Sequence, residues 1–225
     1  MTPAQALRTV PPEARPEAAL AAVVHGEADV DAVRSAAQGC HACDLWERAT
    51  QTVFGQGPVP ARLMLVGEQP GDQEDVRGEP FVGPAGRILD QALEAAGIDR
   101  QTVFVTNVVK HFKWRPAASG KRRLHERPNR TEIGACLPWV ETELALVRPE
   151  ALVLLGATAT AALVGPKVSV TRDHGVALAS ELAPLVVATV HPSAVLRARG
   201  SDARDELQAG LVADLEAVAR QLARS

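Results

Sequence analysis

Apolar residues are grouped in short runs from residue 63 onward, with longer mixed stretches between them. Four such runs lie at residues 63–66, 103–109, 152–155 and 185–190. Continuous apolar runs of this length are typical of strands that are buried on both faces of a parallel sheet. The pattern therefore predicts βαβ units around one central sheet of four strands.

Three of the mixed stretches carry helix signals. Pro84 suits the first turn of a helix that ends at Gly97, and another helix begins at Thr131. A last helix starts near Ser201 and carries one apolar stripe, formed by Leu207, Leu211, Leu215, Val218 and Leu222. We therefore expect an α/β fold with three layers, α/β/α, around a mainly parallel four-stranded sheet.

Two segments do not fit this pattern of runs and helices. Residues 1–35 are rich in Ala, Pro, Glu and Val, which indicates a helical or loosely ordered extension before one domain over residues 36–225. Residues 168–178 alternate around a central Asp-His-Gly, which favours a hairpin or a bent edge strand.

The composition excludes several classes of protein. With 46% hydrophobic and 23% charged residues, the 225-residue chain is globular rather than disordered or fibrous. The sequence holds neither an apolar run of about 18 residues nor a basic segment followed by an apolar one at its N-terminus. We therefore expect a cytoplasmic protein without a membrane span or a signal peptide.

Charge is unevenly distributed along the chain. Residues 110–130 hold eight of the 24 Lys and Arg residues and one of the 27 acidic residues, so this segment carries +7 and the rest of the chain −10. A basic segment on an acidic protein attracts polyanions such as a nucleic-acid backbone. The same charges are also compatible with a solvated surface loop.

Polar side chains accompany the ends of the predicted strands. Glu68 follows the first run, Asn107 lies near the end of the second, and His191 follows the last. Open α/β sheets bind ligands beyond the carboxyl ends of their strands, so these side chains are expected at one edge. A single Asn or Gly-Pro there would more often be a simple turn. The sequence contains no phosphate loop and no Gly-x-Ser-x-Gly elbow.

The three cysteines form a Cys40-x-x-Cys43 pair and a distant Cys136. Two thiolates on one tight turn can bind a common metal or cluster, and a third cysteine can join them through the fold. The candidates for a fourth ligand are His41, His111 and His125. The spacing does not separate zinc from an iron–sulfur cluster, and a lone Cys-x-x-Cys also suits a redox pair or buried thiols without a metal.

Four motifs occur in one order: Glu68-Gln69-Pro70-Gly71-Asp72, Pro80-Phe81-Val82-Gly83-Pro84-Ala85-Gly86, Thr106-Asn107-Val108-Val109-Lys110 and His191-Pro192-Ser193. In order and spacing they resemble the motifs of the iron–sulfur (family 4) uracil-DNA glycosylases, over residues 37–222. Lys121-Arg122-Arg123-Leu124-His125, together with Gln69, resembles the UdgX branch of that superfamily. Ordinary members have Ala in place of Gln69 and lack the extra segment with its histidine.

The resemblance implies a fold, a cofactor and a set of site residues. The fold is that of the uracil-DNA glycosylases, and the cofactor is a [4Fe–4S] cluster held by Cys40, Cys43, His111 and Cys136. Ordinary members have a fourth cysteine in place of the histidine. The implied catalytic residues are His125, Glu68 and His191. The implied substrate-binding residues are Gln69, Asp72, Phe81, Asn107 and Arg123.

These residue types suit cleavage of the bond between deoxyribose C1′ and uracil N1, which leaves positive charge on the sugar and negative charge on the base. Phe81 would stack on the extruded base, Asn107 would read its polar edge, and His191 would donate a hydrogen bond to uracil O2. Glu68 would stabilise the sugar cation or accept a proton from an imidazole. The alternative for Phe81 is core packing, and for Glu68 it is a cap on the following turn.

His125 separates the possible mechanisms. If a neutral His125 attacks the sugar cation before water does, a bond between C1′ and nitrogen forms and the enzyme stays attached after one turnover. Arg122 and Arg123 disfavour the protonated imidazole and attract DNA phosphates. The alternative is that His125 is one more solvated residue of a basic loop.

We therefore expect a single-turnover uracil-DNA glycosylase of DNA repair that becomes covalently linked through His125. The alternatives are a multiple-turnover enzyme that uses water and a non-enzymatic iron–sulfur module that binds DNA. The expected partner is uracil-containing DNA, with a preference for single strands. The protein is expected to be a monomer without membrane contact.

Overall fold

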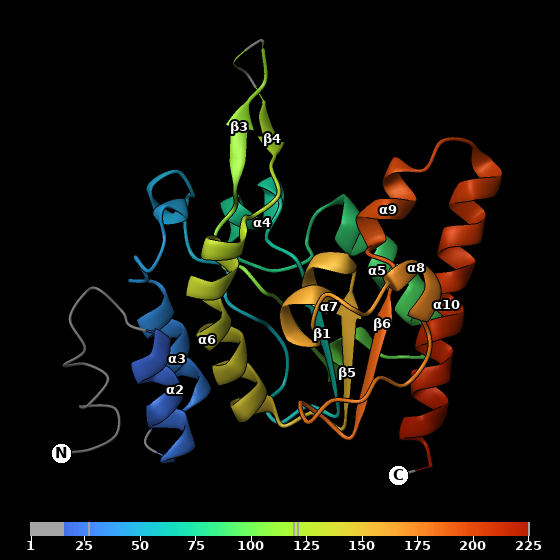
Figure 1. Ribbon diagram of the computed structural model, residues 1–225, viewed down its shortest axis with the longest axis horizontal. Helices are drawn as coiled ribbons and strands as arrows, with labels where there is room; N and C mark the ends of the chain where they lie inside the picture. Colours follow the sequence, from blue (N-terminus) through green and yellow to red (C-terminus); the bar gives the residue numbers. More distant parts are fainter. Residues whose placement is uncertain (1–15, 27, 119, 121, 225) are drawn as a thin grey trace. The chain divides into compact units, whose positions relative to one another are not determined.

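The computed structural model describes residues 16–26, 28–118, 120 and 122–224 (Figure 1). The chain is divided between two compact units, each made of three stretches of sequence. The cysteine unit comprises Met1–Gly55, Gln69–Pro80 and Asn107–Leu146, and the sheet unit comprises Gln56–Glu68, Phe81–Thr106 and Val147–Ser225. The boundary between an extension and one domain at residue 35 stays a prediction.

The sheet unit is built around four strands in the order β2-β1-β5-β6. They are β1 Leu63–Gly67, β2 Val103–Asn107, β5 Ala151–Leu155 and β6 Leu185–Thr189, and every residue in them is buried. The sheet is parallel, with Leu63 opposite Ala151 and Ala151 opposite Leu185. All four predicted strands are confirmed. The second ends at Asn107, two residues before the end of its apolar run, and Asn107 itself belongs to the cysteine unit.

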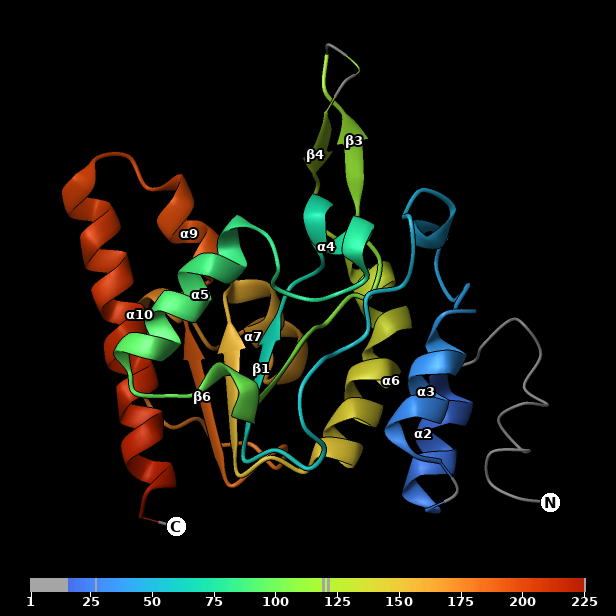
Figure 2. The ribbon, with the colours of Figure 1, turned by 180° about the vertical axis from the view of Figure 1, so that it is seen from behind.

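Helices cover both faces of this sheet (Figures 1 and 2). On one face lie α5 Pro84–Ala95 and α10 Ser201–Leu222, with the short α9 Pro192–Arg197 packed against both. On the other lies α7 Ala157–Leu163, which contacts β1 and β5. A 3-10 turn, η2 Arg100–Thr102, leads into β2. The core between α5, α10 and the sheet includes Leu65, Leu89, Leu93, Leu211 and Leu215. The predicted α/β/α layering is confirmed.

The helix boundaries follow the sequence signals. α5 has Pro84 in its first turn, and the chain leaves the helix through Gly97 in the left-handed region at φ 71°. The predicted stripe of α10 is buried over its centre, at Leu211, Leu215 and Val218. Among the described helices, none combines the length and the apolar composition that a membrane span requires.

The prediction for residues 168–178 is wrong over most of the segment. Val170–Asp173 form a short helix, α8, and the Asp173 carboxylate accepts the Ser169 backbone N–H at 2.8 Å across its single turn. Strand pairing is limited to an isolated antiparallel bridge between Ala177 and Val187. The Asp173 side chain closes a helical turn, and the alternation of apolar and polar residues does not register such a contact.

The cysteine unit contains α2 Pro16–Val24, α3 Val30–Ala37, the 3-10 turn η1 Asp44–Glu47, α4 Asp72–Arg77 and α6 Arg130–Val147. The long α6 confirms the helix predicted from Thr131. It begins with a capping box, in which Asn129 Oδ1 accepts the Glu132 N–H at 2.9 Å and Glu132 Oε2 accepts the Asn129 N–H at 2.6 Å.

The basic segment forms a β-hairpin rather than an irregular loop. β3 Trp114–Pro116 pairs antiparallel with β4 Arg123–His125, with Trp114 opposite His125. Residues 119 and 121, between these strands, lie outside the described residues. Strands of three residues, one of them ending in proline, have no apolar alternation from which a hairpin could be predicted.

Candidate functional site

The predicted metal ligands lie in the cysteine unit. They are Cys40 after α3, Cys43 at the start of η1, His111 after β2 and Cys136 in α6. Cys40, His111 and Cys136 are buried. The two buried sulfurs accept hydrogen bonds, Cys40 Sγ from the Trp139 indole at 3.1 Å and Cys136 Sγ from the Lys110 backbone N–H at 3.2 Å.

Burial sets the charge states of these side chains. It raises the pKa of the Cys136 thiol to about 12, and it also raises the pKa of Cys43, to which the charge of Cys40 adds. Burial lowers the pKa of His111 to about 4. His111 is therefore a neutral imidazole at pH 7, and the Cys136 thiol would lose its proton only to a metal.

A hydrogen bond fixes the tautomer of His111. Its Nε2 lies 2.9 Å from the Thr52 hydroxyl, and that hydroxyl donates its single proton to the Ala37 carbonyl at 2.9 Å. Thr52 must then accept from His111, so the ring proton is on Nε2 and the lone pair is on Nδ1. Metal-binding histidines are oriented by such a contact of their second nitrogen.

The chemistry of the donor set can be compared with that of a single-ion site and of a cluster. Within the described ranges, no group of three His, Cys, Asp or Glu side chains is arranged to hold one metal ion. In an iron–sulfur cluster the cysteines need not converge on one centre, and hydrogen bonds to the sulfurs tune its properties. Three cysteines, a neutral imidazole and two N–H···S bonds are therefore compatible with the predicted cluster.

A buried ion pair begins at the residue before His111. Lys110 Nζ lies 2.6 Å from Glu143 Oε2, and both side chains have 0% exposure. Lys110 Nζ also donates to the Asn107 carbonyl at 2.7 Å, and Glu143 Oε1 accepts the Gly55 N–H at 2.8 Å. The pair thereby links the end of β2, α6 and the segment that ends at residue 55.

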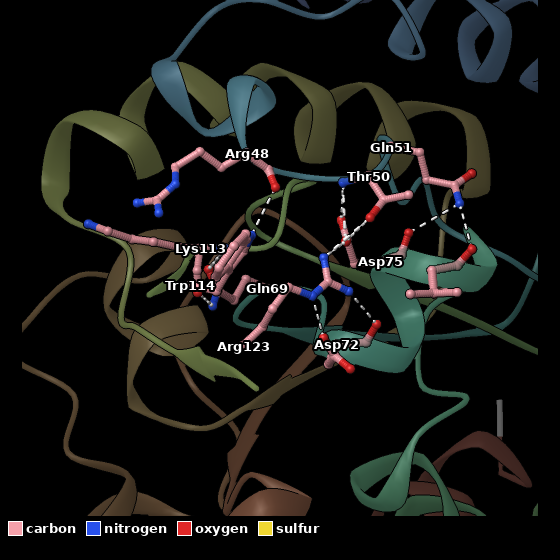
Figure 3. A network of polar contacts seen from close by, with 10 residues as sticks. Arg48, Thr50, Gln51, Gln69, Asp72, Asp75, Lys113, Trp114 and Arg123 are labelled. Atoms are coloured by element: carbon pink, nitrogen blue, oxygen red, sulfur yellow. Dashed lines mark hydrogen bonds and ion pairs between the residues drawn. The ribbon is translucent and has the colours of Figure 1, made fainter. Parts of the chain in front are cut away.

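Gln69 joins the two ends of the hairpin, and Figure 3 shows it beside Lys113 at one of them. Its side-chain oxygen accepts the Lys113 N–H at 3.1 Å, and its nitrogen donates to the carbonyls of Lys113 at 3.2 Å and Glu126 at 3.1 Å. Lys113 precedes β3 and Glu126 follows β4, and their backbones share a further hydrogen bond of 3.0 Å. Gln69 therefore holds the backbone on both sides of the hairpin that carries His125.

Arg123 binds two carboxylates of α4 (Figure 3). Its Nε and Nη1 donate to Asp72 Oδ1 and Asp75 Oδ2, each at 2.5 Å. The fully buried Asp75 also accepts the Thr50 N–H at 2.9 Å and the Thr50 hydroxyl at 2.5 Å. Arg123 and Asp72 thus support the hairpin from α4. Direct contact of either side chain with DNA stays a prediction.

His125 is exposed at the end of β4. It lies opposite Trp114 in the hairpin, and its ring centre is 6.1 Å from that of Phe112. The Arg123 guanidinium stands 5.4 Å from the centre of the same Phe112 ring. An exposed imidazole is therefore carried on a strand whose backbone and neighbours are held in place.

His191 lies in the sheet unit, together with Glu68 and Phe81. Its Nδ1 accepts the Ser193 backbone N–H at 3.0 Å, so the proton of the neutral ring is on Nε2. This tautomer suits a donor to a departing base. The ring centres of His191 and Phe81 are 6.1 Å apart, with the planes tilted by 30°.

Glycines make room for Phe81 and His191. Phe81 has φ 58°, in the left-handed region that bulky residues rarely adopt, and a Cβ at Gly86 would collide with its carbonyl group. Gly156 has φ 88°, and a Cβ there would stand 2.8 Å from His191 Cβ. Phe81 is 6% exposed and belongs to the core of the sheet unit. Core packing and base stacking therefore stay as alternative roles for its ring.

Glu68 and Asn107 occupy the strand ends from which they were predicted. Glu68 follows β1, and its Oε2 accepts a short hydrogen bond from the Thr158 hydroxyl of α7. Asn107 ends β2, is buried, and has its carbonyl held by Lys110. The parallel strands place Glu68 and His191 beyond the carboxyl edge of one sheet, as predicted.

Residues 54–216 match the model of a family described as the uracil DNA glycosylase superfamily. The chain belongs to this superfamily. It is 37% identical to a type-4 uracil-DNA glycosylase of Thermotoga maritima over 166 residues, which are 73% of this chain and 82% of that protein. The corresponding enzyme of Pyrobaculum aerophilum is 35% identical over 176 residues, 75% of this chain and 85% of that protein. That of Sulfurisphaera tokodaii is 36% identical over 165 residues, with 70% and 71% covered.

Several residues of these networks lie outside the motifs that resemble the superfamily. Thr158 follows the third strand, where the rule that ligands bind at strand ends points. Asp75 and Glu143 carry no such signal, because their partners are 48 and 33 positions away in the chain. Only the fold of this superfamily member brings those partners together.

Replacing Glu143 by Ala should strongly destabilise the protein, because Lys110 would keep a buried charge without its carboxylate. We expect a loss of about 3–5 kcal/mol in the free energy of unfolding, measured by denaturant titration. The matched control is Glu150→Ala, which breaks the exposed pair with Arg62 and should cost about 0–1 kcal/mol. Equal losses in the two variants would contradict the importance assigned to the buried pair.

Proposed function

We propose that this protein is a uracil-DNA glycosylase that excises uracil and then remains covalently attached to the abasic site through His125. Membership of the superfamily, and relatives named type-4 uracil-DNA glycosylases, support the excision of uracil from DNA as a repair reaction. The segment 121–125 and Gln69 support the finer assignment to the UdgX branch.

The observation that carries the capture step is the support of the hairpin. Gln69 bonds to the backbone at both ends of the hairpin, and Arg123 is bound by Asp72 and Asp75. A solvated residue of a basic loop would need no such support. A nucleophile that competes with water does need it, because attack requires the reacting atoms to be held near contact distance.

Excision begins with the bond between C1′ and uracil N1, whose electron pair leaves with the base. His191 donates its Nε2 proton in a hydrogen bond to uracil O2 and so stabilises the uracil anion. Asn107 reads the polar edge of the base, and Phe81 stacks on its face. Because these side chains cannot act on a base inside a duplex, the nucleotide must first leave the stack, which is easiest in a single strand.

Capture completes the reaction at the electron-deficient C1′. Glu68 stabilises the sugar cation, and a nitrogen lone pair of His125 forms the new bond to C1′. The imidazole proton then passes to solvent, so charge and atoms balance. The resulting bond has no easy leaving group, and the protein therefore acts once.

Two other functions would use many of the same residues. In a multiple-turnover glycosylase, water attacks C1′ and His125 only contributes to the surface. In a non-enzymatic module, the hairpin binds DNA and no base is released. The supported position of His125 favours the covalent mechanism over both.

The proposed cofactor is a [4Fe–4S] cluster held by Cys40, Cys43, His111 and Cys136. The neutral His111, with its lone pair on Nδ1, and the N–H···S bonds to Cys40 and Cys136 support it. Its role is structural, because it would join the turn after α3, the end of β2 and α6. No step of the reaction passes through it.

Replacing His125 by Ser should abolish the adduct and leave uracil release measurable, because water would then take the position of the nucleophile. Denaturing gel electrophoresis with a labelled single-stranded uracil oligonucleotide measures the adduct. The exposed His25→Ser variant and a thymine oligonucleotide are the controls. A heat-stable adduct formed by His125→Ser would contradict the covalent mechanism through His125. Repeated release of uracil by the native protein without any adduct would also contradict it.

Replacing Gln69 by Ala should uncouple capture from excision, because the hairpin loses hydrogen bonds at both ends. We expect the rate of adduct formation to fall about tenfold, as the loss of about 1.4 kcal/mol of positioning would give. The readout is the fraction of excised uracils that end as adduct. Gln73→Ala, on the exposed side of α4, is the matched control. If the fraction of adduct is unchanged in Gln69→Ala, the hydrogen bonds of Gln69 do not position His125.

Replacing Cys136 by Ala should remove the cluster and destabilise the fold, because cluster binding energy is folding energy. Iron and acid-labile sulfide per protein, measured after anaerobic purification, should fall together with the unfolding temperature. His125→Ser should keep the full iron content. Native protein that holds no iron under these conditions would rule out the cluster.

A further inference from the structure

Trp46 forms an exposed aromatic surface beside the Cys40-x-x-Cys43 turn of the cysteine unit. It lies in η1 and is 40% exposed, although indole side chains are mostly buried. One face of its ring is stacked on His41, with the ring centres 3.9 Å apart and the planes 24° from parallel. The His41 stack fixes the orientation of an indole that stays open to solvent.

Arg48 is held close to this surface. It caps η1, two residues after Trp46, and its guanidinium lies 4.9 Å from the Trp114 ring centre. The Trp114 indole in turn donates to the Arg48 carbonyl at 2.9 Å (Figure 3). The Arg48 side chain is exposed, so its charge is available at the surface while its backbone is tied to β3.

Arg48 connects the segment of Trp46 to the hairpin. Trp114, which contacts Arg48, is the first residue of β3 and lies opposite His125. All of these residues belong to the cysteine unit. A DNA strand joined to His125 must continue away from it on both sides of the abasic site. On one side, Trp114 lies opposite His125, Arg48 contacts Trp114, and Trp46 precedes Arg48 by two residues.

We propose that Trp46 and Arg48 bind a nucleotide of the same DNA strand that flanks the excised uracil. The base stacks on the Trp46 ring and a backbone phosphate binds the Arg48 guanidinium. Exposed aromatic rings that stack on bases, together with cations that bind phosphates, hold single strands without reading their sequence. The carboxylates of η1, Asp44 and Glu47, disfavour a phosphate at the indole itself and leave Arg48 as the phosphate ligand.

The inference rests on the proposed function, because it takes uracil-containing DNA as the substrate. It adds a site that neither the excision nor the capture chemistry requires. The competing explanation is that the Trp46 ring and His41 only cover the cysteine turn, and the test must separate these two roles.

The test compares two single-stranded uracil oligonucleotides, one with several nucleotides on each side of the uracil and one with a single nucleotide on each side. The full-length protein is held in excess, and uracil release is followed in one turnover as the protein concentration is varied. Trp46→Ala and Arg48→Ala should raise the half-saturating concentration at least about fivefold on the long strand, the lower range for losing one stacked base. The maximal rate, and the values for the short strand, should not change.

Control variants separate stacking from folding. Trp46→Phe keeps an aromatic face and should retain most of the affinity for the long strand. Val176→Ala, which removes a 53% exposed apolar side chain from the sheet unit, should have no effect. If Trp46→Ala loses iron or unfolds at lower temperature, Arg48→Ala alone decides the outcome.

Equal effects on long and short strands, or no effect of Arg48→Ala, would overturn the proposal. Failure of the proposed function would look different, because native protein would then neither release uracil nor form an adduct. In that case, fluorescence anisotropy with a long strand that lacks uracil still measures whether Trp46 and Arg48 bind DNA.

Discussion

The fully buried ion pair of Lys110 and Glu143 is the constraint on which the cysteine unit depends. Taking two charges out of water costs several kcal/mol per ion, roughly, and only a complete set of partners offsets it. The Asn107 carbonyl and a backbone N–H complete that set. Because the partners come from β2, α6 and the chain before residue 56, only one arrangement of these segments satisfies them all. The pair thereby fixes where His111 lies relative to Cys136, which shares α6 with Glu143.

Most of the fold could be predicted from the sequence because burial on both faces leaves a strong local signal. Every residue of β1, β2, β5 and β6 is buried, so each strand is mostly apolar along its length. The two failures concern elements that depend on specific contacts. α8 is a single turn closed by Asp173, and the hairpin is held by Gln69, 44 positions before Lys113. Neither contact leaves a periodic pattern of apolar residues in the sequence from which it could be predicted.

The positions of the candidate residues in the fold could be predicted from the sequence, but their contacts could not. Strand ends and motifs point to Glu68, Asn107 and His191, since parallel strands end at a common edge. The tautomers of His191 and His111 depend on Ser193 and Thr52, and no spacing rule identifies those partners. The same limit applies to Arg123, whose charge suggests a phosphate ligand in the sequence and whose contacts are with Asp72 and Asp75.

The ion pairs also change what the basic segment can do for DNA binding. Among the described residues of this segment, at least three cations are engaged with carboxylates: Lys110 with Glu143, Lys113 with Glu132 and Arg123 with α4. These charges support the hairpin, so the segment supplies fewer phosphate contacts than its formal +7 suggests. Affinity that comes from phosphates alone falls steeply with salt. Because these cations are paired within the protein, more of its affinity for a DNA strand must come from stacking and base contacts. The exposed indole of Trp46 is suited to such stacking.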